Sequence, residues 1–261
     1  AGPDPGAGAP PLERIERGEN CWSHGQMAPR PRQSCTADAR QKRTEEQHYH
    51  DLSLICLDHE NFDLGMEIVD VGLKHKPDSG RLRVYRGVLL VMKGHVEEAE
   101  REFETARTLG PGGPAPDVAL AMAWMQSGDA SKAVDLLRAR RKGGAREAVV
   151  PYMLGIALMR TGVDPAAPDG AEAIGAFEEA IRLDPALAGP RAELGKVLLG
   201  RGDTEKAIGQ LERATSLDPD NPAPLYQLGQ AYRKVGNTAR AQELLARVTK
   251  LNEQGRSDDP D

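Results

Sequence analysis

Six tandem copies of one pattern run without a gap from Glu46 to Gly255. The copies cover residues 46–79, 80–113, 114–147, 148–187, 188–221 and 222–255. Five of them are 34 residues long, and the fourth has 40. Self-similarity at a fixed period of this length is typical of stacked helical hairpins, each of which buries its apolar face only against its neighbours. The repetition therefore predicts an all-α solenoid with no single large core.

Each copy combines apolar residues at helical spacing with small residues at fixed places, as in Leu228-Gly229 of the last copy. The small Gly of this pair is predicted to let a second backbone approach closely. A second Gly suits a left-handed helix C-cap that turns the chain back: Gly94, Gly128, Gly162, Gly202 and Gly236. A small residue follows where the two helices are predicted to cross most tightly: Ala99, Ala133, Ala173, Ala207 and Ala241. A proline that cannot continue the helix then ends the unit: Pro77, Pro111, Pro185 and Pro219.

These residues closely resemble the tetratricopeptide repeat (TPR), over about four fifths of the chain. Three positions depart from that family: Glu60 stands at the turn Gly, Gly65 at the tight Ala, and Arg86 at the Leu of the Leu-Gly pair. The resemblance implies a right-handed superhelical solenoid of antiparallel helix hairpins. It also implies that the first helices line a concave groove, which in this family usually binds a peptide or helix of a partner.

The groove positions of the family can be assigned copy by copy. Copies two to four place an apolar strip there: Val84, Val88, Met92, Val118, Met122, Met125, Tyr152, Ile156 and Met159. Copies five and six place basic and polar residues there instead: Lys196, Tyr226, Arg233 and Lys234. Methionine is flexible and polarizable, so a Met-containing strip adapts to an apolar partner. The basic end is suited to an acidic group.

The predicted function is therefore a non-enzymatic protein–protein interaction scaffold that holds a partner's peptide or helix in this groove. One alternative is a self-assembling structural protein, because no repeat follows to cover the apolar residues of the last helix: Leu244, Leu245, Val248 and Leu251. A second alternative is a metal-associated or cofactor-associated subunit of a larger complex. It depends on Cys21, His24 and Cys35.

Residues 1–45 have a different composition, and residues 256–261 form a polar tail. Residues 1–11 are almost entirely Ala, Gly and Pro, too few apolar groups to offset chain entropy, so we expect a largely irregular leader. Its larger apolar residues are candidates to occupy the groove as an internal plug: Leu12, Ile15, Trp22 and Met27. Because the chain starts at Ala1, we expect either a fragment or an exported protein after removal of a signal peptide.

Cys21 and Cys35 are candidates for a disulfide, which would stabilise the leader by roughly 3 kcal/mol and would require an oxidising compartment. An exported or periplasmic location is then favoured over a cytoplasmic one. The alternative is three reduced cysteines in a cytosolic protein. Cys56 is predicted to be a buried small apolar residue. No metal site is predicted, because only one Cys-x2-His spacing occurs and structural zinc needs four ligands.

The sequence carries no known catalytic or phosphate-binding motif, so neither an enzyme nor a cofactor is predicted. The carboxylate pairs Glu97-Glu98 and Glu178-Glu179 are interpreted as surface charge on outer helices. The basic run 138–142 lacks interleaved aromatics, and the net charge is −6, which argues against nucleic acid as a partner. No stretch is apolar and long enough to span a membrane.

Overall fold

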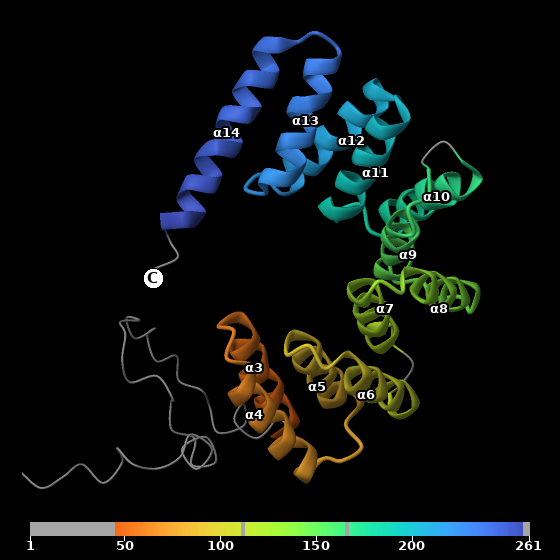
Figure 1. The fold of residues 1–261 in the computed structure, drawn as a ribbon, viewed down its shortest axis with the longest axis vertical. Helices are drawn as coiled ribbons and strands as arrows, with labels where there is room; N and C mark the ends of the chain where they lie inside the picture. The colour runs from red at the N-terminus through yellow and green to blue at the C-terminus, as the bar shows by residue number, and fades with distance from the viewer. Residues whose placement is uncertain (1–44, 111–112, 165–166, 258–261) are drawn as a thin grey trace, which may run out of the picture. The chain divides into compact units, whose positions relative to one another are not determined.

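The computed structural model describes residues 45–110, 113–164 and 167–257 (Figure 1). In this part of the chain there are twelve helices and no strand, which confirms the all-α fold. They fall into two compact units, which divide between residues 112 and 113. Unit 1 contains α3 (Glu45–Asp58), α4 (Phe62–His75), α5 (Gly80–Met92) and α6 (Val96–Leu109). Unit 2 contains α7 (Ala115–Ser127), α8 (Ala130–Lys142), α9 (Val149–Arg160), α10 (Pro168–Leu183), α11 (Ala188–Arg201), α12 (Thr204–Leu217), α13 (Pro222–Lys234) and α14 (Thr238–Ser257).

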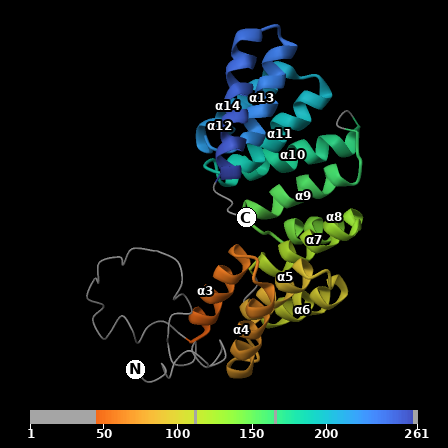
Figure 2. The same ribbon diagram turned by 60° about the vertical axis from the view of Figure 1, so that its left-hand side comes forward.

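Within each unit, every odd-numbered helix packs antiparallel to the next one as a hairpin (Figure 2). The predicted turn glycines all take the left-handed conformation, with φ from +79° to +93°. Glu60 occupies the same place in the first hairpin with φ +54°, and no other non-glycine residue described has a positive φ. The N–H of the following residue, Asn61, donates to the Cys56 carbonyl at 2.8 Å, as Asp129 does to Trp124 at 2.7 Å. Such bonds satisfy the last carbonyls of a helix, so Glu60 supports the same cap as glycine but with backbone strain.

The Gly of the Leu-Gly pair is required by a close contact, but with a side chain and not with the predicted backbone. A Cβ on Gly155 would lie 2.5 Å from Cε1 of Phe177 on α10, and one on Gly87 would lie 2.4 Å from Cε1 of Phe103 on α6. A large side chain of the second helix therefore fills the space over this glycine. The predicted crossing alanines are buried, as expected for the tightest approach of the two helices.

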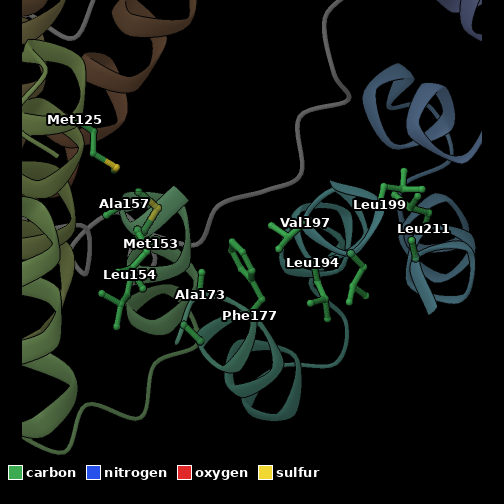
Figure 3. Packing of buried hydrophobic residues seen from close by; sticks show 14 of the residues in the cluster. Met125, Met153, Leu154, Ala157, Ala173, Phe177, Leu194, Val197, Leu199 and Leu211 are labelled. Carbon is green, nitrogen blue, oxygen red and sulfur yellow. The ribbon is translucent and has the colours of Figure 1, made fainter. Parts of the chain in front are cut away.

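The core of unit 2 is one continuous cluster of buried aliphatic residues with Phe177 near its middle (Figure 3). Leu154 and Leu194 occupy corresponding places in successive first helices, and both are buried. Because each hairpin packs on the one before it, the cluster continues along the unit without a separate centre.

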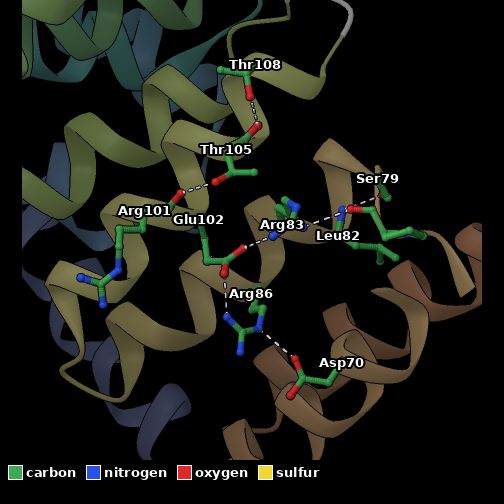
Figure 4. A network of polar contacts seen from close by, with 10 residues as sticks. Asp70, Ser79, Leu82, Arg83, Arg86, Arg101, Glu102, Thr105 and Thr108 are labelled. Atoms are coloured by element: carbon green, nitrogen blue, oxygen red, sulfur yellow. Dashed lines mark hydrogen bonds and ion pairs between the residues drawn. The ribbon is translucent and has the colours of Figure 1, made fainter. Parts of the chain in front are cut away.

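Unit 1 has a smaller buried cluster, centred on Val69, Leu82 and Leu89, and a polar network beside it. Arg86, which replaces a Leu of the repeat pattern, pairs with Asp70 of α4 at 2.8 Å and with Glu102 of α6 at 2.7 Å. Glu102 also accepts from Arg83 at 3.0 Å (Figure 4). The three helices are thus joined by ion pairs at a place where unit 2 uses leucine.

Arginine side chains donate hydrogen bonds to the carbonyl groups of two prolines between hairpins. Arg83 donates to the Pro77 carbonyl at 3.1 Å, and Arg191 donates to the Pro185 carbonyl at 3.5 Å. These two arginines hold the same place in their copies, and each also donates to the second helix of its own hairpin. They fix the turn between successive hairpins.

The six extra residues of the fourth copy lie between Gly162 and Ala173, and this segment is only partly a loop. The two prolines and the glycine of residues 163–170 predict a loop throughout, whereas α10 begins at Pro168. This part of the prediction is wrong, because proline is well suited to the first turn of a helix, where its missing N–H has no partner to lose.

Candidate partner-binding surface

The first helices of unit 2 lie on the inner side of its curve. Helix α7 packs on α9, and α11 packs on α13, whereas the second helices α8, α10, α12 and α14 do not pack on one another in this way. Helices that touch their equivalents lie inside a curved array, and those held apart lie outside. We name "inner surface" the predicted groove residues of unit 2 that are not buried and not bonded to the backbone: Val118, Met122, Tyr152, Ile156, Met159, Lys196, Tyr226 and Arg233.

The part of the inner surface on α7 and α9 is apolar. Met122 is 49% exposed, whereas Val118, Ile156 and Met159 are half-buried against the core. Met125 differs, because it is only 7% exposed and belongs to the core cluster. Three residues turn a helix by about 300°, so Met125 is rotated by about 60° from Met122.

The part on α11 and α13 is basic and polar. Lys196 is exposed and lies 3.7 Å from the Glu193 carboxylate, and Arg233 is also exposed. Lys234 has a structural contact instead: its Nζ donates to the Leu199 carbonyl at 3.2 Å, near the end of α11. A cation at this place stabilises the negative end of the neighbouring helix. Sequence reasoning missed this, although Arg160 of α9 makes the same contact with the Met125 carbonyl.

Tyr152 lies between the apolar and basic parts. Its ring packs at a tilt against Phe177, with centroids 6.3 Å apart, and its hydroxyl lies 2.6 Å from where a Cβ on Gly189 would be. Burial raises the pKa of this hydroxyl, and the Glu193 carboxylate raises it further. The hydroxyl is therefore neutral at physiological pH and able to donate a hydrogen bond.

The tetratricopeptide repeat family models match residues 152–222 and residues 198–258. The chain is a tetratricopeptide repeat protein. Among solved structures, it is similar to yeast Tom70, at 19% identity and a TM-score of 0.67, over 82% of this chain and 44% of that one. It is similar to Pseudomonas aeruginosa PilF, at 14% identity and a TM-score of 0.65, over 82% of this chain and 97% of that one. It is also similar to MamA, at 23% identity and a TM-score of 0.54, over 66% of this chain and 96% of that one.

At these identities the similarity is one of fold. None of the curated protein sequences matches the chain. The TPR fold supports a protein–protein interaction scaffold, and proteins of this kind are generally not enzymes.

The first TPR hairpins contain the remaining predicted groove residues. On α5 of unit 1, Val84 and Val88 are half-buried and Met92 is exposed. A polar cluster around the buried His50, which the sequence did not predict, joins α3 to α5. Nε2 of His50 lies 2.7 Å from the Tyr85 hydroxyl and 2.6 Å from Nη2 of Arg81. No sequence signal marks this cluster, because its members come from two helices and match no motif.

The basic run 138–142 is used within the TPR array. Arg138 donates to Glu172 at 2.5 Å, Arg141 pairs with Glu179 at 2.6 Å, and Arg140 pairs with the buried Asp117 at 3.5 Å. The hydrogen bond from Arg138 lowers the pKa of Glu172. These pairs join α8 to α10 and to α7, so this run has structural partners.

Cys56 is buried in α3, as predicted. Cys21, His24 and Cys35 lie outside the described residues, so the disulfide stays a hypothesis. Within the described residues, no group of three or more His, Cys, Asp or Glu side chains could hold a metal ion. No helix described is long and apolar enough to cross a membrane.

Proposed function

We propose that the inner surface of unit 2 binds an extended segment or amphipathic helix of a partner protein and that the chain has no enzymatic role. The apolar part on α7 and α9 holds apolar side chains of the partner. Lys196 and Arg233 orient the partner by attracting an acidic group. The solved TPR protein YrrB, described as having an unusual peptide-binding site, supports a peptide as a reasonable ligand for this fold.

One observation carries this proposal. Among the described residues of unit 2, the large apolar side chains exposed in the interior of a helix are Met122 and Tyr226, and both belong to first helices. The other exposed ones are Leu187, Leu217 and Val235, which lie at helix ends or in turns. Apolar side chains exposed on one side of an array are typical of an interaction surface.

The test compares immobilised parent protein with two variants in an extract of the native source. Met122→Glu with Ile156→Glu should lose the specifically retained partner, because burying each unpaired carboxylate costs several kcal/mol. Leu217→Glu, at a residue 43% exposed on an outer helix, is the matched control and should retain it. A peptide from the retained partner then gives affinities for all three proteins. Equal affinities would contradict the proposal, provided that circular dichroism shows the same helix content in each.

Self-association through the last hairpin is the second candidate. In α12, Leu211 and Ala214 are fully buried, whereas Leu245 and Val248 at the corresponding places in α14 are only half-buried. Leu244 is buried within its own hairpin, so the apolar face is smaller than predicted. A second copy on this face would make the mass in solution depend on concentration, and Val248→Glu should abolish that dependence.

A further inference from the structure

The charges of this chain are unevenly distributed. Residues 1–44 contain seven Lys or Arg and five Asp or Glu, a net charge of +2. Residues 45–110 contain eight Lys or Arg and fourteen Asp or Glu, a net charge of −6. Residues 113–257 contain nineteen Lys or Arg and eighteen Asp or Glu, a net charge of +1. The segment before α3 is therefore complementary in charge to unit 1 and not to unit 2.

Helix α3 has an apolar face that no described residue covers. Leu54 is 44% exposed and Ile55 is 40% exposed. In the other five copies, the residue at the place of Ile55 is buried: Leu89, Ala123, Ala157, Val197 and Ala231. Among the described helices, α3 packs on α4 and α5. It is the first helix of the described array, and an apolar face at the end of such an array needs a cap.

We propose that residues 22–44 of this chain cap the free face of α3. Trp22 and Met27 pack against Leu54 and Ile55. The basic residues between position 30 and position 43 lie against the acidic surface of unit 1, where Asp58 and Glu60 are exposed. This interaction is separate from partner binding by unit 2.

The chain length and its tether favour this occupant over a second molecule. Seventeen residues lie between Met27 and Glu45, and the extended chain between the two reaches up to about 60 Å. Helix α3, with 14 residues, is only about 21 Å long, so Met27 can reach any part of its face. A short tether also gives an effective concentration in the millimolar range, far above that of a second copy in dilute solution.

The experiment uses the fluorescence of Trp22 in the full chain. The only other tryptophan is Trp124, so Trp124→Phe leaves Trp22 as the single reporter. At low salt we expect blue-shifted emission and slow quenching by acrylamide. Ile55→Asp should increase the quenching at least about twofold by placing a charge under the apolar contact. Leu217→Asp is the control with similar exposure and should change nothing.

A second variant keeps the proposal testable if Ile55→Asp disturbs α3. Arg40→Glu with Lys42→Glu and Arg43→Glu lies before the helices and should release Trp22 in the same way, as should high salt in the parent. Quenching as fast as in a peptide of residues 12–44, or unchanged by both variants, would overturn the proposal.

Two other results would also overturn it. If Met92→Asp increased the quenching of Trp22 and Ile55→Asp did not, the segment would lie on α5, where the internal plug described above would place it. If Trp22 were shielded from acrylamide only at high protein concentration, the segment of a second copy would be the occupant. No partner protein takes part in these measurements, so their outcome is independent of the proposed function.

Discussion

At the scale of single residues, this fold depends on backbone conformations and contacts that few side chains allow. The turn of every hairpin needs a left-handed residue, and five turns use glycine while the first uses Glu60. A non-glycine residue pays about 1–2 kcal/mol in this conformation. Glycine avoids that cost, although it loses more chain entropy on folding.

We therefore predict that Glu60→Gly stabilises the protein by about 0.5–1 kcal/mol. Gly128→Ala is the reverse change at an equivalent turn with φ +93° and should destabilise by a similar amount. Urea unfolding of both variants measures the two differences. A loss of stability in Glu60→Gly would show that the Glu60 side chain makes a favourable contact that outweighs the strain.

The contact between a first-helix glycine and a second-helix ring makes a second prediction. Gly155→Ala should destabilise the protein by about 1–3 kcal/mol, because its Cβ would overlap the Phe177 ring. Gly175, in α10, has open space around its Cβ position. Gly175→Ala should therefore stabilise by up to about 1 kcal/mol, as expected in a helix. Equal effects of the two changes on the thermal midpoint would contradict this contact.

At the scale of helices, the two units use different interactions for equivalent packing. In unit 1, Arg86 bridges Asp70 and Glu102, while unit 2 has buried leucines such as Leu154 at that place. An ion pair is often no more stabilising than a well-packed apolar residue, but breaking one partner is costly. The network thus holds α4, α5 and α6 together without necessarily adding stability.

The network predicts an asymmetry between two substitutions. Arg86→Leu restores the repeat pattern, leaves Glu102 paired with Arg83 and should change stability by less than about 1.5 kcal/mol. Glu102→Leu leaves two guanidinium groups without their shared carboxylate and should destabilise by about 3 kcal/mol. Denaturant unfolding of the two variants measures both changes. A greater loss in Arg86→Leu would contradict the role of Glu102 as the centre of the network.

The Arg138–Glu172 pair between α8 and α10 predicts a pH dependence. Because Arg138 lowers the pKa of Glu172 in the folded state, the pair contributes stability above the unfolded pKa, about 4.3. This contribution is lost as the pH falls through the lower folded pKa. The stability difference between the parent and Glu172→Gln should be constant above about pH 5, below about 1 kcal/mol for this partly exposed pair, and vanish in acid. A difference that persists at low pH would contradict the charge interaction.

At the scale of the whole molecule, the repeat period predicted the fold because each hairpin is specified by local pattern. Gly128 and Ala133 were found as turn and crossing residues from their spacing alone. The candidate surface was less predictable. Met125 and Lys234 matched groove positions, yet one is core and the other bonds the Leu199 carbonyl. A rotation of about 60° decides the first case and a bond between hairpins the second, and the groove positions of the repeat pattern specify neither.

We expect partners to bind the inner surface of unit 2, and site-specific photo-crosslinking tests this binding. A photoreactive amino acid replaces Met122 in one variant and Leu217, on outer helix α12, in another. Both side chains are similarly exposed in the free protein, so both reach solvent equally well. We expect a crosslinked partner from position 122 and none from position 217. Efficient crosslinking from position 217 without any from position 122 would contradict it.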